Sequence, residues 1–411
     1  ANQSVNVNGG YSYTEKDTLS VNLVRFDLGL LNKFLGDNFG IAGLATGNAI
    51  IYSPWESNAG LMMRLVSDST EVAGRRMGTF RIAGSLGNGK MHVIARNDID
   101  GKRTMNITGD YLLKNHRIDA TADLDRFDAG YIAPVMESVF SEMGGSISGR
   151  VKASGTLDSL SLSSEGTRFD DVLLRVGFTN VPYYVSGPFS VTDQGLFFDE
   201  VTIKDRFDGT GTIAGGLLYD HLKNFRMDTR IKMRGIEAID MTESDNQTFY
   251  GHLFASGDVS VKGPFEAILL DVNVRTDKDG RIHIPIDNAS NDGKNDLLTF
   301  KQAFKEVYID PYEAMMNKMT TGGGKGSDFG IKLKVHATQG TEAYVEIDRA
   351  AGNVLNGCGQ GTIDIEVRPA RDLFTINGDY TLRSGNFHFN AMDIAKRDFT
   401  ISEGSTVRFN G

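Results

Sequence analysis

Residues Phe225–Met233 read FRMDTRIKM and alternate between apolar and charged side chains along most of their length. Successive side chains of a β-strand point to opposite faces, so this alternation predicts a strand with one face buried. One face would carry Phe225, Met227, Thr229, Ile231 and Met233, and the other Arg226, Asp228, Arg230 and Lys232. The stretch therefore predicts a sheet with one apolar and one charged face.

The same alternation recurs along most of the chain. Examples are Leu253–Val261 and Ile331–Ala337, and short turn sequences such as Gly87-Asn88-Gly89 separate the runs. Strands joined by tight turns pair as antiparallel hairpins. Glycine is frequent (48 residues) and proline scarce (8 residues), as expected for many short strands and turns. We therefore predict an all-β antiparallel meander of about 25 strands spaced by about 4.8 Å.

Irregular repeats extend along the chain. Arg25-Phe26-Asp27-Leu28-Gly29 recurs as Arg126-Phe127-Asp128-Ala129-Gly130. Each copy is expected to open a short helix, over Leu30–Phe39 and over Tyr131–Met143. Repeats spread from one end to the other favour a single extended sheet over several globular cores.

The expected helices are too few to cover so many strands, so the apolar face needs another cover. We expect an elongated antiparallel sheet curled lengthwise into an open half-pipe, or β-taco, with an apolar interior and a few short helices. Such a groove would suit a long, thin, apolar ligand. A closed sandwich with a dry core, as in an adhesin or scaffold, is an alternative.

One region interrupts the strand pattern. Residues 1–286 are expected to form a repetitive β body and 329–411 a C-terminal β region that continues the same groove, separated by an insert of loop, helix and linker over 287–328. Within the insert, 297–319 is a helical candidate broken by Pro311. This helix would either cover exposed sheet or gate the groove through Phe304, Tyr308, Met315 and Met316.

Charge and cysteine content exclude several functions. The net charge is −10 and the basic residues are dispersed, which argues against nucleic-acid binding. Cys358 is the only cysteine, so neither an intramolecular disulfide nor a cysteine-built metal site can form. The N-terminal sequence contains no recognisable signal peptide or membrane-spanning helix. We expect a fragment whose anchor lies outside this chain.

Gly209–Leu217, GTGTIAGGL, satisfies the G-x-G-x-x-(G/A) pattern of dinucleotide sites. That pattern requires a long helix after the glycines, whereas Leu217–Met233 predicts a turn and an alternating strand. The Gly-Thr-x-x-Ile-Ala-Gly frame also recurs at Gly78–Gly84, which indicates a repeated strand. Gly211 and Gly215 would mark either a tight bend or room left for a ligand.

No catalytic or metal-binding constellation stands out. Gly323–Asp328 and Asp277–Gly280 each resemble part of a calcium loop but lack the remaining ligands. The seven histidines are scattered singly, and neither H-E-x-x-H nor G-x-S-x-G occurs. We expect no catalytic residue, no metal and no cofactor, with the histidines at exposed strand or turn positions.

The residues predicted to line the groove are the apolar members of alternating segments. Their direction depends on strand register, because a slip of one residue turns each side chain to the other face. They are Phe80, Ile82, Ile107, Ile203, Ile213, Met227, Ile231, Met233, Val259, Ile331, Leu333, Val335, Val345 and Ile365.

The C-terminal stretch resembles a known family. Its pattern is Gly378-x-Tyr380-x-Leu382-x-x-Gly385-x-Phe387-x-Phe389, followed by Phe399-x-Ile401-x-x-Gly404-Ser405-x-Val407-x-Phe409-x-Gly411. This spacing is similar to the closing signature of the TamB family, the large subunit of the translocation and assembly module of two-membrane bacterial envelopes. The family is related to AsmA-like proteins, and the upstream repeats resemble its body more loosely.

The resemblance implies a β-taco anchored in the inner membrane and joined to a TamA-like outer-membrane β-barrel of the BamA superfamily. It implies a periplasmic location between the two membranes and non-enzymatic transfer of phospholipids along the hydrophobic groove. The alternative is a chaperone that assembles outer-membrane β-barrel proteins, through strand addition at an exposed edge. Because the family normally continues past the position of Gly411, the barrel-contacting end is expected to lie outside this chain.

Overall fold

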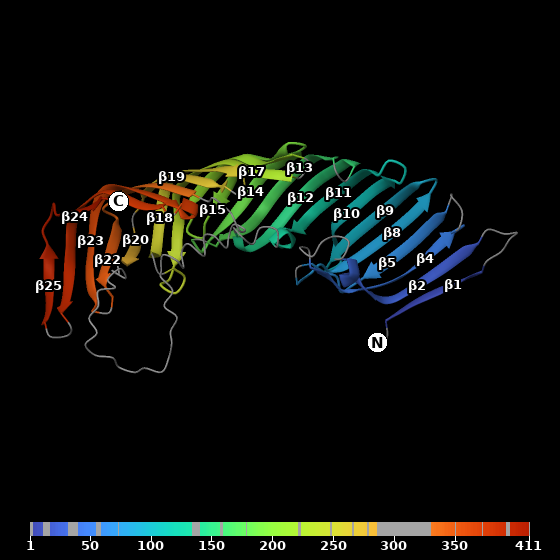
Figure 1. Cartoon of the computed structure of the whole chain (residues 1–411), viewed down its shortest axis with the longest axis horizontal. Helices are drawn as coiled ribbons and strands as arrows, with labels where there is room; N and C mark the ends of the chain where they lie inside the picture. The colour runs from blue at the N-terminus through green and yellow to red at the C-terminus, as the bar shows by residue number, and fades with distance from the viewer. Residues whose placement is uncertain are drawn as a thin grey trace. The chain divides into compact units, whose positions relative to one another are not determined.

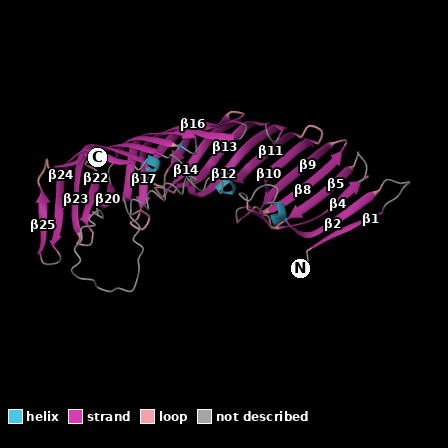
Figure 2. Cartoon of the chain, viewed as in Figure 1, coloured by secondary structure: helices cyan, strands magenta, loops and turns pink. Residues whose placement is uncertain are grey.

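A computed structural model of the chain describes all residues except 1–2, 11–16, 32–39, 55–58, 73, 134–139, 157–158, 178, 221–222, 247–248, 265–266, 278, 286–329, 350, 372, 392–394 and 411. The described residues form 26 strands, which make up most of the structure, and a few short helical turns (Figure 2). Twenty-three strands belong to one hydrogen-bonded sheet. The all-β prediction is therefore confirmed.

The strands of the N-terminal part lie side by side in chain order, each antiparallel to the next (Figure 1). They are β1 (Ser4–Gly10), β2 (Thr18–Asp27), β4 (Leu44–Tyr52), β5 (Gly60–Ser67), β8 (Thr79–Gly87), β9 (Lys90–Ile99), β10 (Lys102–Leu112), β11 (Arg117–Asp128) and β12 (Phe140–Thr156). The short strands β3 (Ile41–Ala42), β6 (Glu71–Val72) and β7 (Arg75–Arg76) form a separate small sheet.

The remaining strands follow along the chain. They are β13 (Ser159–Val176), β14 (Val181–Thr192), β15 (Gly195–Lys204), β16 (Thr210–Asp220), β17 (Lys223–Met241), β18 (Tyr250–Pro264), β19 (Leu269–Thr276), β20 (Gly280–Pro285), β21 (Gly330–Ala337), β22 (Thr341–Asp348), β23 (Asn353–Arg368), β24 (Leu373–Ala391), β25 (Ala395–Ile401) and β26 (Thr406–Asn410). The 3-10 turn η5 spans Pro369–Arg371.

The chain divides into two compact units. Unit 1 comprises Ala1–Leu174, Tyr184–Val201 and Gly216–Phe225, and unit 2 comprises Arg175–Tyr183, Thr202–Gly215 and Arg226–Gly411. The boundaries expected near residues 287 and 329 remain a prediction. Because the insert lies outside the described residues, so do its expected helix and the four gate residues.

Unit 2 departs from an antiparallel meander at one place. β19 runs parallel to β21, and β20 runs parallel to β22. Parallel neighbours cannot be joined by a tight turn and need a crossover of a dozen or more residues. β20 ends at Pro285 and β21 begins at Gly330, so the sequence between them is long enough for such a connection. The meander prediction is wrong here. Turn sequences indicate only hairpins between consecutive strands, whereas a long connection can place two strands side by side in the same direction.

The sheet is open. In unit 1, β1 pairs with β2 at one margin. In unit 2, β25 and β26 both pair with β24 at another margin. A closed barrel has no free edges, so these terminal strands agree with the open sheet expected of a half-pipe.

The repeated Arg-Phe-Asp motif forms a β-bulge. Register shifts after Leu23 and after Leu124 leave Arg25 and Arg126 with positive φ angles of 55° and 52°. The N–H groups of these arginines donate to the hydroxyls of Thr46 and Ser148, each at 3.2 Å. Bulges insert one extra residue and bend the strand, so the repeat marks a bend at the same point of two strand pairs.

A short 3-10 turn follows each bulge. Asp27 and Asp128 each accept a hydrogen bond from the N–H of the glycine two residues later, at 2.8 and 2.7 Å. The turns are η1 (Leu28–Leu31) and η3 (Ala129–Ile132). The longer helix expected over Tyr131–Met143 is wrong at its end, because β12 already begins at Phe140. The apolar periodicity of that segment belongs partly to a strand.

Asp128→Ala is expected to destabilise unit 1, because the Gly130 N–H loses the carboxylate acceptor 2.7 Å away. Loss of a capping side chain costs about 1 kcal/mol. Urea unfolding followed by circular dichroism measures the change. Asp128→Asn keeps a side-chain oxygen and should unfold at nearly the wild-type midpoint, whereas equal losses for the two variants would contradict the capping role.

Candidate functional site

Strand register builds the apolar face of unit 1. On β8, β9 and β10, Ile82, Ala95 and Ile107 lie directly opposite one another. Residues opposite each other in antiparallel strands project to the same face. From β2 to β12 the row crosses eight strands through Leu23, Gly47, Leu65, Ile82, Ala95, Ile107, Ala122 and Val151.

Two further rows widen this face. The next row consists of Val21, Ala49, Met63, Gly84, Val93, Gly109, Ala120 and Ala153, and the one beyond it of Leu19, Ile51, Leu61, Leu86, Met91, Tyr111, Ile118 and Gly155. Rows on one face are two residues apart, or about 6.7 Å along a strand. The three rows therefore form one continuous apolar surface.

The opposite face of unit 1 is polar. Asn106 lies opposite Arg96 and Asp123, and Asp123 lies opposite Arg150. Arg150 Nε is 2.5 Å from Asp123 Oδ1. Hydrogen bonds from Lys90 and His92 hold the pKa of Asp110 below its usual range. The two faces thus differ in chemistry as the alternating sequence predicts.

Unit 2 has a corresponding apolar row. It crosses β17, β18, β19, β21, β23 and β24 through Ile231, Val259, Val272, Leu333, Ile365 and Ile376. The parallel pairing of β19 with β21 and of β20 with β22, here called the parallel step, does not interrupt this row, because Val272 lies opposite Leu333. The adjacent row on the other face is polar: Lys232, Asp258, Asn273, Lys334, Asp364 and Asn377.

The apolar face remains partly exposed. Every member of the first unit 1 row is half-buried. In unit 2, Ile331 and Val367 form a small buried cluster against which Leu270, Leu333 and Ile365 pack. Contiguous exposed apolar patches larger than a few hundred Å² mark interaction sites. The rows are therefore the candidate functional surface.

Most of the residues predicted to line the groove share these faces. Phe80, Ile82 and Ile107 lie on the face of unit 1, and Met227, Ile231, Met233, Val259, Ile331, Leu333, Val335 and Ile365 on that of unit 2. Val345 joins them opposite Ile284 and Leu355. Ile203 is buried, at 5 % exposure, and Ile213 is half-buried.

The glycines of GTGTIAGGL permit close approach of a neighbouring strand. A Cβ on Gly211 would lie 2.5 Å from the carbonyl oxygen of Lys232, and one on Gly215 would lie 2.1 Å from that of Asp228. Gly215 also has a φ of +112°. Of the two expectations for these glycines, the structure favours a tight backbone arrangement over room for a ligand. Thr210–Asp220 is strand β16, so the nucleotide interpretation has no helix to support it.

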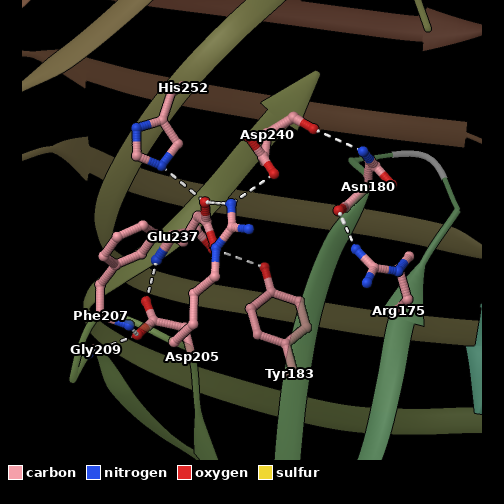
Figure 3. A network of polar contacts seen from close by, with 10 residues as sticks. Arg175, Asn180, Tyr183, Asp205, Phe207, Gly209, Glu237, Asp240 and His252 are labelled. Atoms are coloured by element: carbon pink, nitrogen blue, oxygen red, sulfur yellow. Dashed lines mark hydrogen bonds and ion pairs between the residues drawn. The ribbon is translucent and has the colours of Figure 1, made fainter. Parts of the chain in front are cut away.

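A buried polar network occupies the polar face of unit 2 (Figure 3). The Glu237 side chain is fully buried and forms a bidentate pair with Arg206, at 3.0 and 2.6 Å. His252 Nε2 lies 2.7 Å from the same carboxylate. Arg206 also contacts Asp240 at 2.5 Å. Hydrogen bonding to Glu237 raises the pKa of Arg206, so the guanidinium stays charged.

Side chains also satisfy the main chain of Glu237. Its N–H donates to Asp205 at 2.6 Å, and its carbonyl accepts from the Tyr183 hydroxyl at 2.9 Å (Figure 3). Asp205 additionally accepts the N–H groups of Phe207 and Gly209, at 2.7 and 2.8 Å. Burial raises the pKa of Tyr183, which keeps its hydroxyl a donor. These contacts fix the turn between β15 and β16 onto β17.

The oxygen and nitrogen atoms of Glu237, Asp240 and His252 lie close enough together to hold a metal ion. The Arg206 guanidinium, however, contacts both carboxylates and supplies their positive charge. A metal would have to displace a bidentate ion pair from a buried carboxylate. The arrangement is explained without a metal.

The sequence contains one indication of this network. Arg206-Phe207-Asp208-Gly209 is a shortened third copy of the Arg-Phe-Asp motif. The expectation of exposed histidines is wrong for His92, His252, His283 and His336, which are all half-buried. Two of them, His252 and His283, pair with Glu237 and Glu346. Because their acidic partners are distant in sequence, spacing along the chain gives no indication of these pairs.

A second polar cluster joins β18, β20 and β22. Glu346 accepts hydrogen bonds from Tyr250 at 2.5 Å, His283 at 2.9 Å and Arg349 at 2.8 Å. The His283 ring stacks between those of Tyr250 and Tyr344, with centroids 4.6 and 4.4 Å apart. The stack follows the strand register across the parallel step.

The ionisation of this cluster follows from its contacts. Burial alone would raise the pKa of Glu346, but the hydrogen bonds from Tyr250, His283 and Arg349 outweigh burial and lower it. Burial, together with the hydrogen bond to Glu346, raises the pKa of Tyr250 to about 12. At neutral pH, the carboxylate is therefore ionised and the tyrosine is neutral.

Comparison with known proteins places the chain. The family model described as the TamB C-terminal domain matches residues 199–411, which is more than half of the 411 residues. The chain belongs to the TamB family. No curated protein and no solved structure matches this TamB-family chain.

Membership gives the broad role. TamB proteins act in outer-membrane protein assembly or lipid transport, in the periplasm, with a TamA-like partner of the BamA superfamily. They are known as non-enzymatic modules. None of the described helices of this TamB-family chain is long and apolar enough to cross a membrane.

Glu346→Gln is expected to destabilise unit 2 at neutral pH but not in acid. The folded pKa of Glu346 is depressed, so its ionised form stabilises the fold above the unfolded pKa of about 4.3. That stability is lost as pH falls through the folded pKa. The gap in melting temperature from wild type should shrink between pH 7 and pH values below about 4.

Asp364→Asn is the control, since Asp364 pairs with Lys334 at the surface, where the two side chains are 54 % and 48 % exposed. Surface pairs of this kind contribute little, so its melting temperature should follow the wild type at each pH. A gap for Glu346→Gln that stays constant down to strong acid would contradict the proposed ionisation.

Proposed function

We propose that this TamB-family chain carries phospholipid acyl chains along its apolar face, across the periplasm between the inner and outer membranes. The observation that carries the proposal is the unbroken apolar row from Leu23 to Val151, with polar side chains on the opposite face. Such a surface binds by removing apolar area from water, which requires neither a catalytic group nor a cofactor.

The dimensions of the unit 1 face suit an acyl chain. Seven spacings of about 4.8 Å give a row about 34 Å long. An acyl chain occupies one leaflet of a hydrocarbon core about 30 Å thick, or about 15 Å. One row is therefore long enough to hold an extended acyl chain. The chain can move along the row without being exposed to water.

The energetic benefit follows from burial. A two-chain lipid exposes about 30 methylenes in water, each costing about 0.8 kcal/mol, or about 24 kcal/mol as an upper figure. A continuous apolar surface removes most of that barrier. Headgroups can stay hydrated beside an open sheet, so their desolvation adds little.

The other elements of the proposal follow the family. They are an inner-membrane anchor and contact with a TamA-like outer-membrane barrel of the BamA superfamily. Within the insert, Phe304, Tyr308, Met315 and Met316 are proposed to gate the groove.

Assembly of outer-membrane β-barrel proteins is the second candidate. The edge of β1 favours it, because among the described residues β1 pairs with β2 alone and its other side presents main-chain N–H and C=O groups. An exposed edge can add a strand from another polypeptide. In that case clients would contact the edge, whereas lipid would contact the rows.

Ile107→Asp is expected to abolish lipid transfer, because it places a carboxylate in the middle of the apolar row. Burying an unpaired polar group costs several kcal/mol, about 2–7. Asn106→Asp adds the same charge to the polar face of the same strand and should preserve transfer. Lipid exchange between donor and acceptor vesicles measures both. Unchanged transfer by folded Ile107→Asp protein would contradict the conduit.

Ile231→Asp should likewise block transfer in unit 2, and Asn273→Asp on its polar face should not. Photocrosslinkers at Ile107 and Ile231 distinguish the two candidates. Lipid adducts support the conduit, whereas adducts with outer-membrane polypeptides and none with lipid support the assembly function.

A further inference from the structure

β17 is irregular at the centre of unit 2. Its register against β18 shifts between Met233 and Ile236 and again between Glu237 and Ile239. Gly235 lies within the first of these shifts and has a φ of 56°. Its N–H donates to the Ser256 hydroxyl at 2.8 Å. Two bulges so close together bend a strand strongly.

At the bend, the side chains on the apolar face are almost fully buried. Ile236 lies opposite Ala255, on the face that carries Val259. Ile236 is 1 % exposed and Ala255 is 5 % exposed, whereas Val259 and Ile231 on the same strands are half-buried. The apolar face is therefore covered at the bend and partly open beside it.

The residue next to Ile236 is the centre of the polar network. Adjacent strand residues point to opposite faces, so holding Glu237 on the polar face directs Ile236 to the apolar face. Glu237 is held by its carboxylate through Arg206 and His252, and by its main chain through Asp205 and Tyr183. The bend thus depends on side chains as well as on the strand ladder.

Arg206 is one of the partly exposed members of this network, together with His252 and Asp240. Its side chain is 41 % exposed while that of Glu237 is fully buried. Its ring neighbour Phe207 is also exposed and packs edge-on against Phe254 at 5.4 Å. The turn that carries both residues lies on the polar face, where Asp205 accepts a hydrogen bond from the N–H of Glu237.

We propose that Arg206 is a positioning residue, and that its pair with Glu237 forms a latch that keeps the apolar face closed at Ile236. The latch sets a constriction in the groove, and its release opens that point to an acyl chain. The role of the constriction in lipid passage rests on the proposed function, whereas the closing of the face does not.

Cysteine labelling tests the latch directly in the full chain. With Cys358→Ser as background, Ile236→Cys should react slowly with a maleimide, and Arg206→Met should accelerate that reaction at least tenfold. Val259→Cys on the same face is the control, and its rate should stay unchanged. Arg206→Lys keeps the charge without the bidentate geometry, so it should give an intermediate rate at residue 236.

Two results would overturn the latch. One is an unchanged labelling rate at residue 236 in the Arg206→Met variant. The other is an equal acceleration at residues 236 and 259, which would mean that Arg206 supports the whole unit. Both variants should retain a cooperative melting transition, which separates local opening from unfolding.

A lipid readout separates this proposal from the proposed function. A photocrosslinker at residue 236 should yield more lipid adduct in the Arg206→Met variant than in the wild-type background. If lipid adducts are absent at residues 107 and 231 as well, the conduit fails and the labelling result still decides the latch. Adducts at residues 107 and 231 with no increase at residue 236 would reject the constriction alone.

Discussion

Backbone hydrogen bonding between neighbouring strands fixes which side chains lie opposite one another, and the remaining features depend on this register. A slip of one residue would turn every side chain of a strand to the other face. In unit 1, the register aligns Ile82, Ala95 and Ile107 into one row. In unit 2, it carries the row across the parallel step from Val272 to Leu333. Ordinary alternating strands thus become a continuous apolar surface.

The polar face holds the bends. Bulges interrupt the ladder and leave main-chain groups without strand partners, so side chains must satisfy them. Thr46 and Ser148 do so at Arg25 and Arg126. At Glu237, Asp205 and Tyr183 take the same role, with Arg206 neutralising the buried carboxylate. Removing one partner of a buried ion pair such as Arg206–Glu237 costs about 3–5 kcal/mol. The bend at Glu237 therefore depends on these particular side chains.

The sequence predicts the faces well and the topology less well. Alternation in Phe225–Met233 depends on a period of two that any strand must obey, so the direction of Ile231 and Met233 follows directly. The parallel pairing of β19 with β21 does not follow, because it depends on where a long connection returns.

The polar networks were harder still to predict. Arg206 meets Glu237, and His283 meets Glu346, only after strands distant in sequence are brought into register. Single residues of these types are common on exposed strand faces, and their burial depends on the bends. The third copy of the Arg-Phe-Asp motif was a usable signal for the first network, but its shortened spacing separated it from the two clear copies.

The central claim is that the apolar rows are a surface for acyl chains. A cryo-electron microscopy map of the chain purified from membranes with its bound lipid tests it most directly. The account predicts elongated density running across the strands over the row from Leu23 to Val151, with no protein layer between density and sheet. A packed protein layer covering that row, or an empty row in a lipid-loaded sample, would contradict it.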